Sequence, residues 1–410
     1  MGAHVVILGA GVGGQVAAHA LRRRLGSGHR ITVVERDPQH AFAPSFLWVM
    51  TGARTPGQVT SPLAKLLARG VNLHEGEVSA IDVAGRRVET SRGSLEFDFL
   101  VVALGAELAA DAVPGLSGRS HSYYSLEGAT RLKPALDALG NGAKVAVLVA
   151  GLPYKCPGAP HEGAMLIADY LRRRRRIDVS VDLFTPEPQP LPVAGPALGG
   201  AVAAMLQSRG VGFHPLHKVA SIADRVLAFD NGASVPFDLL VAIPPHRSPS
   251  VVRTSGLANE AGWISVDRRT LETRAEGVLA IGDITAVQIP GRWKPDVPLL
   301  LPKAGVFAHA EALVAAERVA AAALGQPCDT TFCGDGFCML EAGGGAAGVA
   351  YGDFFAEPAP EVRVRDIGAA WHLGKVLFEQ WWLSPQGARR AVLGAALRAG
   401  SRLTGVPVRL

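Results

Sequence analysis

Two stretches of the chain show the same order of apolar and polar positions. The apolar run at residues 4–8 is followed by a glycine turn, a helix-like pattern and a second apolar run at 31–34. The run at 143–149 is followed by a turn, a helix-like pattern and an alternating run at 179–184. Apolar runs that alternate with helical patterns are typical of strand–helix–strand units with parallel strands. The pattern predicts two Rossmann-like units.

Two later apolar runs extend the first unit. FDFLVVALGAEL at 97–108 and GVLAIGDIT at 277–285 each read as a buried strand that ends near a glycine. The two segments resemble the second and third signatures of two-dinucleotide-binding-domain flavoproteins, and since the second unit lies between them, this resemblance implies that the first domain is split by an inserted domain. The predicted boundaries are 1–113 and 250–325 for the split domain, 114–249 for the insertion and 326–410 for a C-terminal domain.

The last part of the chain, residues 326–410, does not repeat the strand–turn–helix pattern of the two units. Residues 331–358 read as antiparallel strands around a glycine turn, and 386–403 follow a helical pattern. No acidic residue follows Glu379, whereas five arginines do, so this segment could lie on an anionic membrane surface. We therefore predict an α/β fold with two Rossmann-like domains and a C-terminal α+β domain that contacts the other domains or a membrane.

Composition excludes several classes of protein. With 410 residues, 48% hydrophobic and 19% charged, the chain can bury a large core and is not disordered. It has neither a secretory signal nor a transmembrane run, so we expect a cytoplasmic protein, soluble or peripheral at the membrane. Each of the two arginine clusters, Arg22–Arg24 and Arg172–Arg176, ends a helical pattern. The sequence has no basic stripe of the kind that binds nucleic acid. The cysteine spacing predicts no metal site.

The glycine turn of the first unit carries a dinucleotide signature. Gly9, Gly11 and Gly14 form G-x-G-x-x-G between the first strand and its helix. Glycines at this place allow a tight turn and let a pyrophosphate approach the helix N-terminus. Glu35 ends the second strand, where a carboxylate can accept a hydrogen bond from a ribose hydroxyl. The first unit is therefore predicted to bind a dinucleotide.

The matching turn of the second unit reads GLPYKCPGAP and lacks this signature. Pro153 removes a backbone N–H that a phosphate would need, so this unit is not expected to bind a nicotinamide dinucleotide. Cys156 stands between the strand and the helix, beside Lys155. Because a helix N-terminus and a neighbouring cation both favour a thiolate, we expect a reactive cysteine rather than an inert buried thiol.

A cysteine that exchanges electrons in pairs needs a partner. The remaining cysteines are Cys328, Cys333 and Cys338, all in the C-terminal part. Cys338 is favoured because it lies in the strand-like segment GFCMLE, whereas Cys333 is expected in a turn and Cys328 in a loop.

Taken together, these motifs resemble the sulfide:quinone oxidoreductases and the flavoprotein subunit of flavocytochrome c sulfide dehydrogenase. The resemblance rests on the glycine signatures, the turn PYKCPGAPHE, and the segments FAPSFLWV at 42–49 and PKAG at 302–305. It implies FAD as cofactor, bound non-covalently because FAPS contains no cysteine. Beyond Gly9, Gly11, Gly14 and Glu35, the cofactor-binding residues that it implies are Pro44, Ser45, Ala103, Gly105, Gly282, Asp283, Lys303 and Gly305.

The resemblance also implies a mechanism. Cys156 and Cys338 form a redox pair beside FAD, hydrosulfide or a small thiol attacks one sulfur, and the electrons pass to a quinone or another acceptor. Glu162 matches the family's acid after the cysteine turn and would manage protons, or else it only stabilises the helix dipole. Lys303 would stabilise the reduced flavin, or else it is a surface lysine at a helix start. The sequence leaves open whether the protein forms a homodimer and whether Cys156 and Cys338 form a disulfide in the resting protein.

This chain also departs from the family. Many quinone-reducing members carry a further cysteine where this chain has Tyr123, Tyr124 and Ser125. Two alternatives therefore stay open: a type II NADH dehydrogenase-like NAD(P)H:quinone oxidoreductase, and a non-catalytic flavin-binding protein that transfers electrons or binds a partner.

Overall fold

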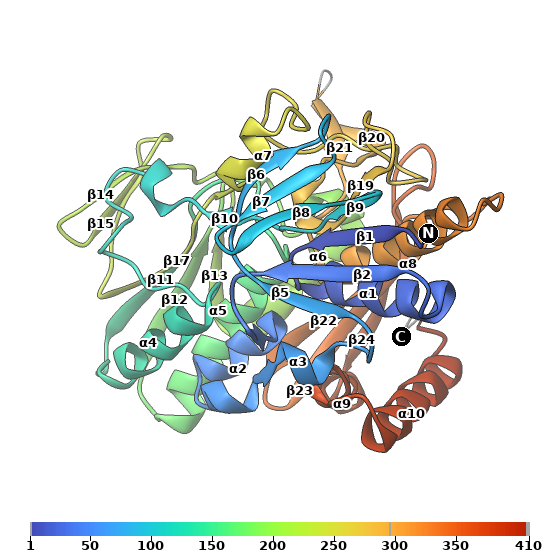
Figure 1. Cartoon of the computed structure of the whole chain (residues 1–410). Helices are drawn as coiled ribbons and strands as arrows, with labels where there is room; N and C mark the ends of the chain where they lie inside the picture. Colours follow the sequence, from blue (N-terminus) through green and yellow to red (C-terminus); the bar gives the residue numbers. More distant parts are fainter. Residues whose placement is uncertain (1, 295–296, 407–410) are drawn as a thin grey trace.

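The first apolar runs form a parallel sheet at the centre of the split domain (Figure 1). The computed structural model describes residues 2–294 and 297–406. The sheet has the order β19-β9-β1-β2-β5, with all neighbours parallel. Its strands are β1 (His4–Leu8), β2 (Arg30–Glu35), β5 (Asn72–Glu75), β9 (Phe99–Val102) and β19 (Val278–Ala280).

Strand β1 shows how this sheet is buried on both faces. Val5 and Ile7 face the helices α1 (Val12–Leu25) and α8 (Gly305–Ala323), which pack against each other. Val6 and Leu8 face the opposite layer, which contains β6 (Val78–Asp82), β7 (Arg87–Thr90) and β8 (Gly93–Glu96). A sheet covered on both faces explains why these strands are continuous apolar runs.

The second unit forms its own parallel sheet, in the order β13-β12-β11-β17. The strands are β11 (Ala143–Val149), β12 (Val179–Phe184), β13 (Val211–His214) and β17 (Leu239–Ile243). One face carries α4 (Leu126–Asp137), α5 (Ala159–Asp169) and α6 (Gly195–Ser208), and the other carries the antiparallel strands β14 (Val219–Ala223), β15 (Val226–Phe229) and β16 (Ser234–Pro236). Residues Tyr170–Arg174 continue α5 as one wider helical turn.

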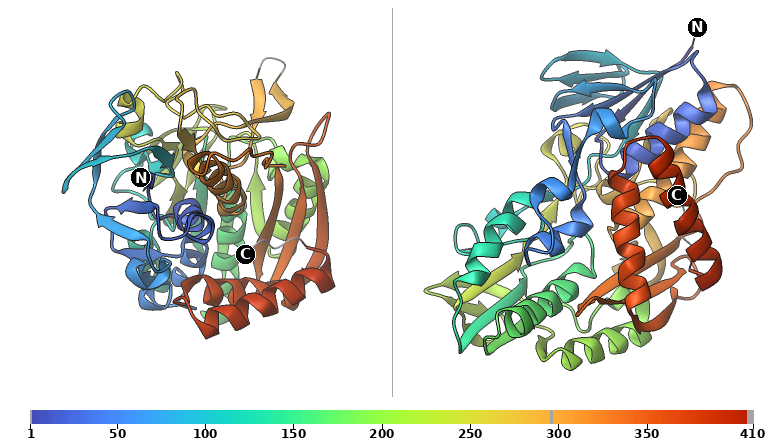
Figure 2. Two further views of the ribbon diagram at one scale, coloured as in Figure 1. Left: turned by 45° about the vertical axis from the view of Figure 1, so that its right-hand side comes forward. Right: turned by 90° about the horizontal axis from the view of Figure 1, so that it is seen from below.

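The C-terminal part connects the two Rossmann-like units. It consists of the antiparallel strands β22 (Asp335–Gly343), β23 (Ala346–Asp353) and β24 (Glu361–Gly368), then α9 (Ala369–Leu383) and α10 (Ala388–Thr404). Leu340 of β22 joins the core around α5, whereas Trp382 of α9 joins the core around α1 and α8. Figure 2 shows the two last helices side by side next to α1 and α8. The sequence predicts antiparallel strands for 331–358, and β22 and β23 lie within that range.

The apolar arc of the last helix is divided. Leu397 is buried and Leu393 is partly buried, whereas Val392 is 69% and Leu403 is 88% exposed. Within the described residues, no helix is long and apolar enough to cross a bilayer. The shorter elements are β3 (Gln39–Ala41), α2 (Phe46–Val49), β4 (Thr60–Pro62), α3 (Leu63–Leu66), β10 (Glu107–Leu108), β18 (His246–Arg247), α7 (Ser250–Thr254), β20 (Gln288–Lys294) and β21 (Val297–Leu300).

Candidate active site

The cysteine turn lies between β11 and α5, at the carboxyl end of the second sheet. Cys156 has a left-handed backbone, with a φ of 54°, which a side chain other than glycine adopts only when its surroundings hold it there. Its N–H donates to the carbonyl of Lys303 at 2.6 Å, and its carbonyl accepts from the Tyr124 hydroxyl at 3.3 Å. The first contact ties the turn to the segment that precedes α8.

Strand β22 brings Cys338 to this turn. A methyl group added at Gly158 would lie 3.4 Å from Cys338 Sγ and 3.6 Å from Glu162 Oε2, so the missing side chain lets strand and turn approach. Cys156 and Cys338 pack against the same core, and all four cysteines are free thiols. Cys333 is exposed instead. The structure thus brings Cys338 beside the turn, while the redox pairing stays a prediction.

The predicted effect of the turn on Cys156 is wrong. Desolvation, followed by the charge of Glu162, raises the pKa of the Cys156 thiol to about 12, and Lys375 offsets only part of this. The same causes raise the pKa of Cys338 above its ordinary value. The charge of Lys155 acts on His246 and Asp283 rather than on the thiol. Both thiols are therefore protonated at neutral pH.

Glu162 belongs to a buried ion-pair network. Its Oε1 accepts from Lys375 Nζ at 2.5 Å and from the N–H of Glu341 at 2.9 Å. The carboxylate of Glu341 lies 2.9 Å from His372 Nδ1. Burial lowers the pKa of Lys375, but the charges of Glu162 and Glu341 outweigh it, so the net shift is upward. Because the His372 side chain is 31% exposed, the network leads from the cysteines to the surface.

The glycine turn of the first unit fits a dinucleotide. A methyl group on Gly9 would lie 2.5 Å from the carbonyl oxygen of Ala103, and one on Gly14 would lie 1.8 Å from that of Gly9. A methyl group on Gly11 would meet nothing within 4 Å, so the turn is open on that side. The first N–H groups of α1 have no partners within the helix and can bind a phosphate there. Glu35 Oε2 accepts from the N–H of Ala10 at 2.8 Å, which fixes its carboxylate at the turn.

The Gly-Asp strand end lies where α8 begins. Gly282 has a φ of 74° and donates its N–H to Glu311 Oε2 at 2.6 Å. Burial raises the pKa of Glu311 to about 7 and also raises that of Asp283. Gly305 is the first residue of α8, and a methyl group there would be 3.5 Å from Val12 of α1. Gly105, with a φ of 67°, follows β9.

Lys303 is half-buried, and neighbouring groups hold its ammonium. Its ammonium donates to the carbonyls of Asp283 at 2.7 Å and Thr285 at 2.9 Å. It also lies 3.6 Å from the ring centroid of Trp263, and burial lowers its pKa to about 8. These contacts disfavour the alternative of a freely solvated surface lysine, and the role of Lys303 toward the flavin stays a prediction.

The segment with Pro44 and Ser45 is fixed against α9. Ser45 is buried in a short helical turn, and its hydroxyl donates to Glu379 Oε1 at 2.6 Å. Arg54 pairs with the same carboxylate at 2.9 Å. The C-terminal part thus holds the segment that the resemblance placed along the flavin.

Sequence reasoning missed the buried charged residues Glu311, Glu341, Lys375 and Glu379, all less than 9% exposed. Lys375 and Glu379 left a signal, since they are charges inside the apolar stretch WHLGKVLFEQWWL. Glu311 likewise interrupts an alanine-rich helix. The sequence gives no signal that Glu341 is buried, because a glutamate in a strand usually faces solvent.

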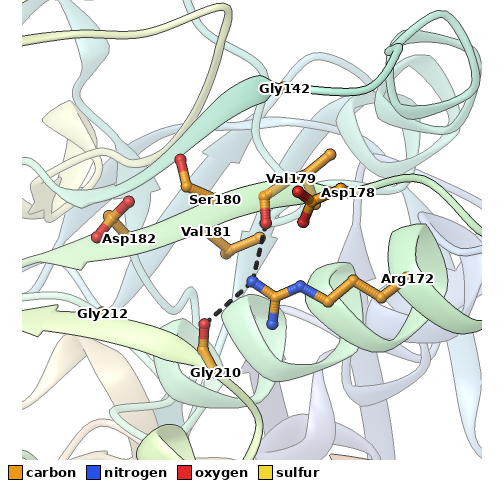
Figure 3. Close-up of a pocket in the computed structure, with 9 residues that line it drawn as sticks. All are labelled: Gly142, Arg172, Asp178, Val179, Ser180, Val181, Asp182, Gly210 and Gly212. Atoms are coloured by element: carbon orange, nitrogen blue, oxygen red, sulfur yellow. Dashed lines mark hydrogen bonds between the residues drawn. The ribbon is translucent and has the colours of Figure 1, made fainter.

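A separate cavity of about 320 Å³ lies at the amino edge of the second sheet (Figure 3). Its lining includes Gly142, Asp178 and Gly210, which directly precede β11, β12 and β13. The guanidinium of Arg172 donates to the carbonyls of Val179 and Gly210 there. Since α/β sheets bind ligands at the carboxyl ends of their strands, this cavity is not the candidate active site.

Comparisons with known proteins agree with this geometry. The family model of pyridine nucleotide-disulphide oxidoreductases matches residues 3–305. The sulfide-quinone reductase of Aquifex aeolicus is 27% identical over 399 residues, which cover 93% of this chain and 91% of that protein. The X-ray structure of sulfide:quinone oxidoreductase from Aquifex aeolicus matches with a TM-score of 0.82 and 25% identity, over 92% of this chain and 90% of that chain.

A mammalian relative is more distant. The mitochondrial sulfide:quinone oxidoreductase of Mus musculus is 25% identical over 301 residues, 68% of this chain. This chain spans only 65% of the mouse protein.

These comparisons confirm several predictions. They confirm the resemblance to sulfide:quinone oxidoreductases, the α/β fold class with Rossmann-like domains, the flavin-dependent oxidoreductase class and FAD as cofactor. The predicted domain boundaries and the roles of single residues are not tested by them. The chain belongs to the pyridine nucleotide-disulphide oxidoreductase family.

Proposed function

We propose that this protein oxidises sulfide through the pair Cys156 and Cys338 and passes the electrons to a quinone. One observation supports the proposal: Cys338 of β22 lies beside the turn that holds Cys156, and the charge of Glu162 acts on both thiols. The curated relatives from Aquifex aeolicus and Mus musculus, which bear the name of this activity, support it.

The first unit would hold FAD. The glycine turn at Gly9–Gly14 would bind its pyrophosphate, Glu35 its ribose, and the strand end at Gly282 and Asp283 its central part. Bound FAD supplies a two-electron acceptor. The Lys303 ammonium donates to the carbonyl of Asp283 at the strand end, and the Lys303 carbonyl accepts from the N–H of Cys156. Lys303 would thereby fix the position of the cysteine turn relative to the FAD site.

The sulfur chemistry balances with two hydrosulfide ions per cycle. The thiols of Cys156 and Cys338 lose two electrons and two protons and form a disulfide. Hydrosulfide attacks one sulfur, the S–S bond breaks, and a cysteine persulfide and a thiol remain. A second hydrosulfide removes the outer sulfur as disulfide ion, HSS⁻, and restores the dithiol. The sum is 2 HS⁻ → HSS⁻ + H⁺ + 2 e⁻.

Glu162 and its partners would manage the protons of this cycle. Because the pKa of the Cys156 thiol is raised to about 12, a base must take its proton before the sulfur can react. The charge of Glu162 acts on both thiols, and its neighbour Glu341, which donates its N–H to Glu162, lies with its carboxylate 2.9 Å from His372. We assign Glu162 as this base and Lys375 as the residue that positions it.

The remaining partners complete the proposal. The arginine-bearing α10, with exposed Val392 and Leu403, would contact the membrane in which a quinone is dissolved. We propose that this contact is on the cytoplasmic face. A homodimer would not be needed for the cysteine site, since both thiols come from one chain.

Anaerobic reduction of the purified FAD-loaded protein tests the function. We expect sulfide to bleach the flavin absorbance and NADH not to, because Pro245 crowds Gly151 at the start of the second turn, where a methyl group would lie 2.7 Å from the Pro245 ring. Cys156→Ser should abolish bleaching, and Cys333→Ser, which removes an exposed thiol, should leave it unchanged. Bleaching by NADH but not by sulfide would favour the NADH dehydrogenase alternative, and no bleaching by either would favour a non-catalytic protein.

A further inference from the structure

The C-terminal helices help to line a second cavity, which is partly open to solvent, on the side of the first unit that carries α1 and α8. Its volume is about 170 Å³, and its wall contains residues of α1, α8, α9 and α10. This is less than the roughly 300 Å³ of the smallest usual ligand pockets, so it suits a small group rather than a whole cofactor. In Figure 2 the helices α9 and α10 lie beside α1 and α8, which places the cavity among all four.

The wall of this cavity is cationic. Arg23, Arg390 and Arg398 line it, and its lining contains no acidic residue. Among the residues that the structure describes, no carboxylate pairs with any of these three guanidinium groups. The neighbours of Arg23 behave differently, since Arg24 pairs with Glu317 at 3.1 Å and Arg22 donates to backbone carbonyls. The middle arginine of the cluster is the one that faces the cavity.

Arg390 is held rigidly in place. Its Nη1 donates to the carbonyls of Trp381 at 3.2 Å, Trp382 at 3.0 Å and Ser384 at 3.1 Å, at the end of α9. The guanidinium also lies 4.4 Å from the ring centroid of Trp381. These contacts occupy a single nitrogen, so the other donors of the group can bind a ligand. Burial lowers the pKa of Arg390 to about 10, as expected for a desolvated cation without a counter-ion.

Two further features favour an anion. Arg398 Nη1 and Trp381 Nε1 both approach Gly394, at 3.4 Å and 3.1 Å from the position of an added methyl group, so that glycine brings two donors together. His19 Nε2 is buried at the same cavity and has no hydrogen-bond partner within the described part of the chain. Burial lowers the pKa of His19 to about 4, and its other ring nitrogen donates to the Leu66 carbonyl, so Nε2 is an acceptor that a ligand hydroxyl, such as a protonated phosphate oxygen, would satisfy.

We propose that this cavity binds a phosphate group, held by Arg23, Arg390 and Arg398. Guanidinium groups match the oxygens of phosphate with paired, charge-assisted hydrogen bonds, and three cations without a counter-ion suit a multiply charged anion. The phosphate could belong to free inorganic phosphate or to the headgroup of an anionic phospholipid. Both present the same chemistry to the three arginines.

Titration of the FAD-loaded full-length protein with inorganic phosphate at constant ionic strength tests the proposal. Isothermal calorimetry should show one site, and Arg23→Gln with Arg398→Gln should weaken it at least about tenfold, since hydrogen bonds between charged groups are strong. The matched control is Arg389→Gln with Arg402→Gln, which removes the same charge from exposed positions outside the cavity. Its affinity should stay within about twofold of the parent protein.

Vesicle flotation separates the two sources. If the phosphate belongs to a lipid, the cavity pair of substitutions should reduce binding to phosphatidylglycerol vesicles well beyond the control pair. If the two double variants lose vesicle binding equally, and only the cavity variant binds inorganic phosphate more weakly, then the ligand is a soluble phosphate. Absence of phosphate binding at millimolar concentration, or equal phosphate affinity in the cavity pair and its control, would overturn the proposal. Unchanged flavin absorbance and Tm show that each variant is folded.

Discussion

The two Rossmann-like units share a strand–turn–helix frame and differ in what the turn contains. Between β1 and α1 the turn is short and glycine-rich, and at Gly11 it is open. Between β11 and α5 the turn is longer, carries prolines and a left-handed Cys156, and is crowded at Gly151. Both turns lie at the carboxyl ends of parallel strands, where α/β proteins place their ligands. The frame therefore sets where chemistry occurs, and the side chains of the turn decide which chemistry.

The same contrast appears in two buried glutamates. Glu311 on α8 serves the first unit and accepts from the N–H of Gly282, and the charge of Lys303 offsets only part of the effect of its burial. Glu162 on α5 serves the second unit and pairs with Lys375 at 2.5 Å. Burial raises the pKa of the Glu311 carboxyl, whereas Glu162 lies within hydrogen-bond distance of an ammonium group. The first arrangement supports a strand end, and the second places a base beside thiols.

The largest expected effect comes from breaking the buried pair in the second unit. Lys375→Met should lower the free energy of unfolding by about 3–5 kcal/mol, because it leaves the charge of Glu162 buried without its partner. Urea unfolding of the FAD-loaded protein at pH 7 measures this. Arg131→Met, which breaks the exposed pair with Glu127, should cost less than about 1 kcal/mol. Equal losses in the two variants would show that the network is not buried as described.

The glutamate of the first unit should make stability depend on pH. Its pKa is raised from 4.5 to about 7, so the folded state holds a proton that the unfolded chain has already lost in this range. The stabilisation is complete below about pH 4.5 and is lost as the pH rises to about 7, with a total of about 3 kcal/mol. Glu311→Gln cannot ionise, and it keeps an oxygen for the N–H of Gly282.

Urea unfolding at several pH values between 5 and 8 checks this prediction. The stability of Glu311→Gln relative to the parent protein should rise across that interval. Parallel pH profiles of the two proteins would contradict it.

A smaller effect is expected at the first turn. Gly14→Ala places a methyl group where the carbonyl of Gly9 lies, and the backbone must shift at a cost of about 1–3 kcal/mol. FAD affinity, measured by fluorescence quenching, should fall about 10–100-fold. Gly28→Ala, whose methyl group would meet nothing within 4 Å, should leave it unchanged. An unchanged affinity in Gly14→Ala would mean that this turn does not hold the cofactor.

The smallest effect is expected at the second turn. Gly158→Ala places a methyl group 2.6 Å from Leu340 Cδ2 and 3.4 Å from Cys338 Sγ. Because these side chains can move, the strand should shift only slightly, and disulfide formation between Cys156 and Cys338 should slow about tenfold, or about 1.4 kcal/mol. Mass spectrometry of diamide-treated protein, with Gly200→Ala as control, measures the rate. A rate equal to that of the control would contradict the proximity of the two thiols.

Local patterns determined much of this protein. The strand–turn–helix units, the dinucleotide turn at Gly9–Gly14 and the altered turn at Cys156 are written in consecutive residues, and backbone geometry acts over the same short range. The positions of Lys303 before α8 and Glu162 in the first turn of α5 follow from the same local reading. Their surroundings do not.

Only the tertiary structure decided what lies around the cysteines. A pKa depends on desolvation and on charges nearby in space, and for Cys156 these come from Glu162 and Lys375 rather than from the adjacent Lys155. Lys375 reaches the site because α9 packs across β22, a contact between segments remote from Cys156 in the chain. The cavity lined by Arg23 and Arg390 has the same origin. Its charges are visible in the sequence, but their convergence results from the packing of α10 near α1.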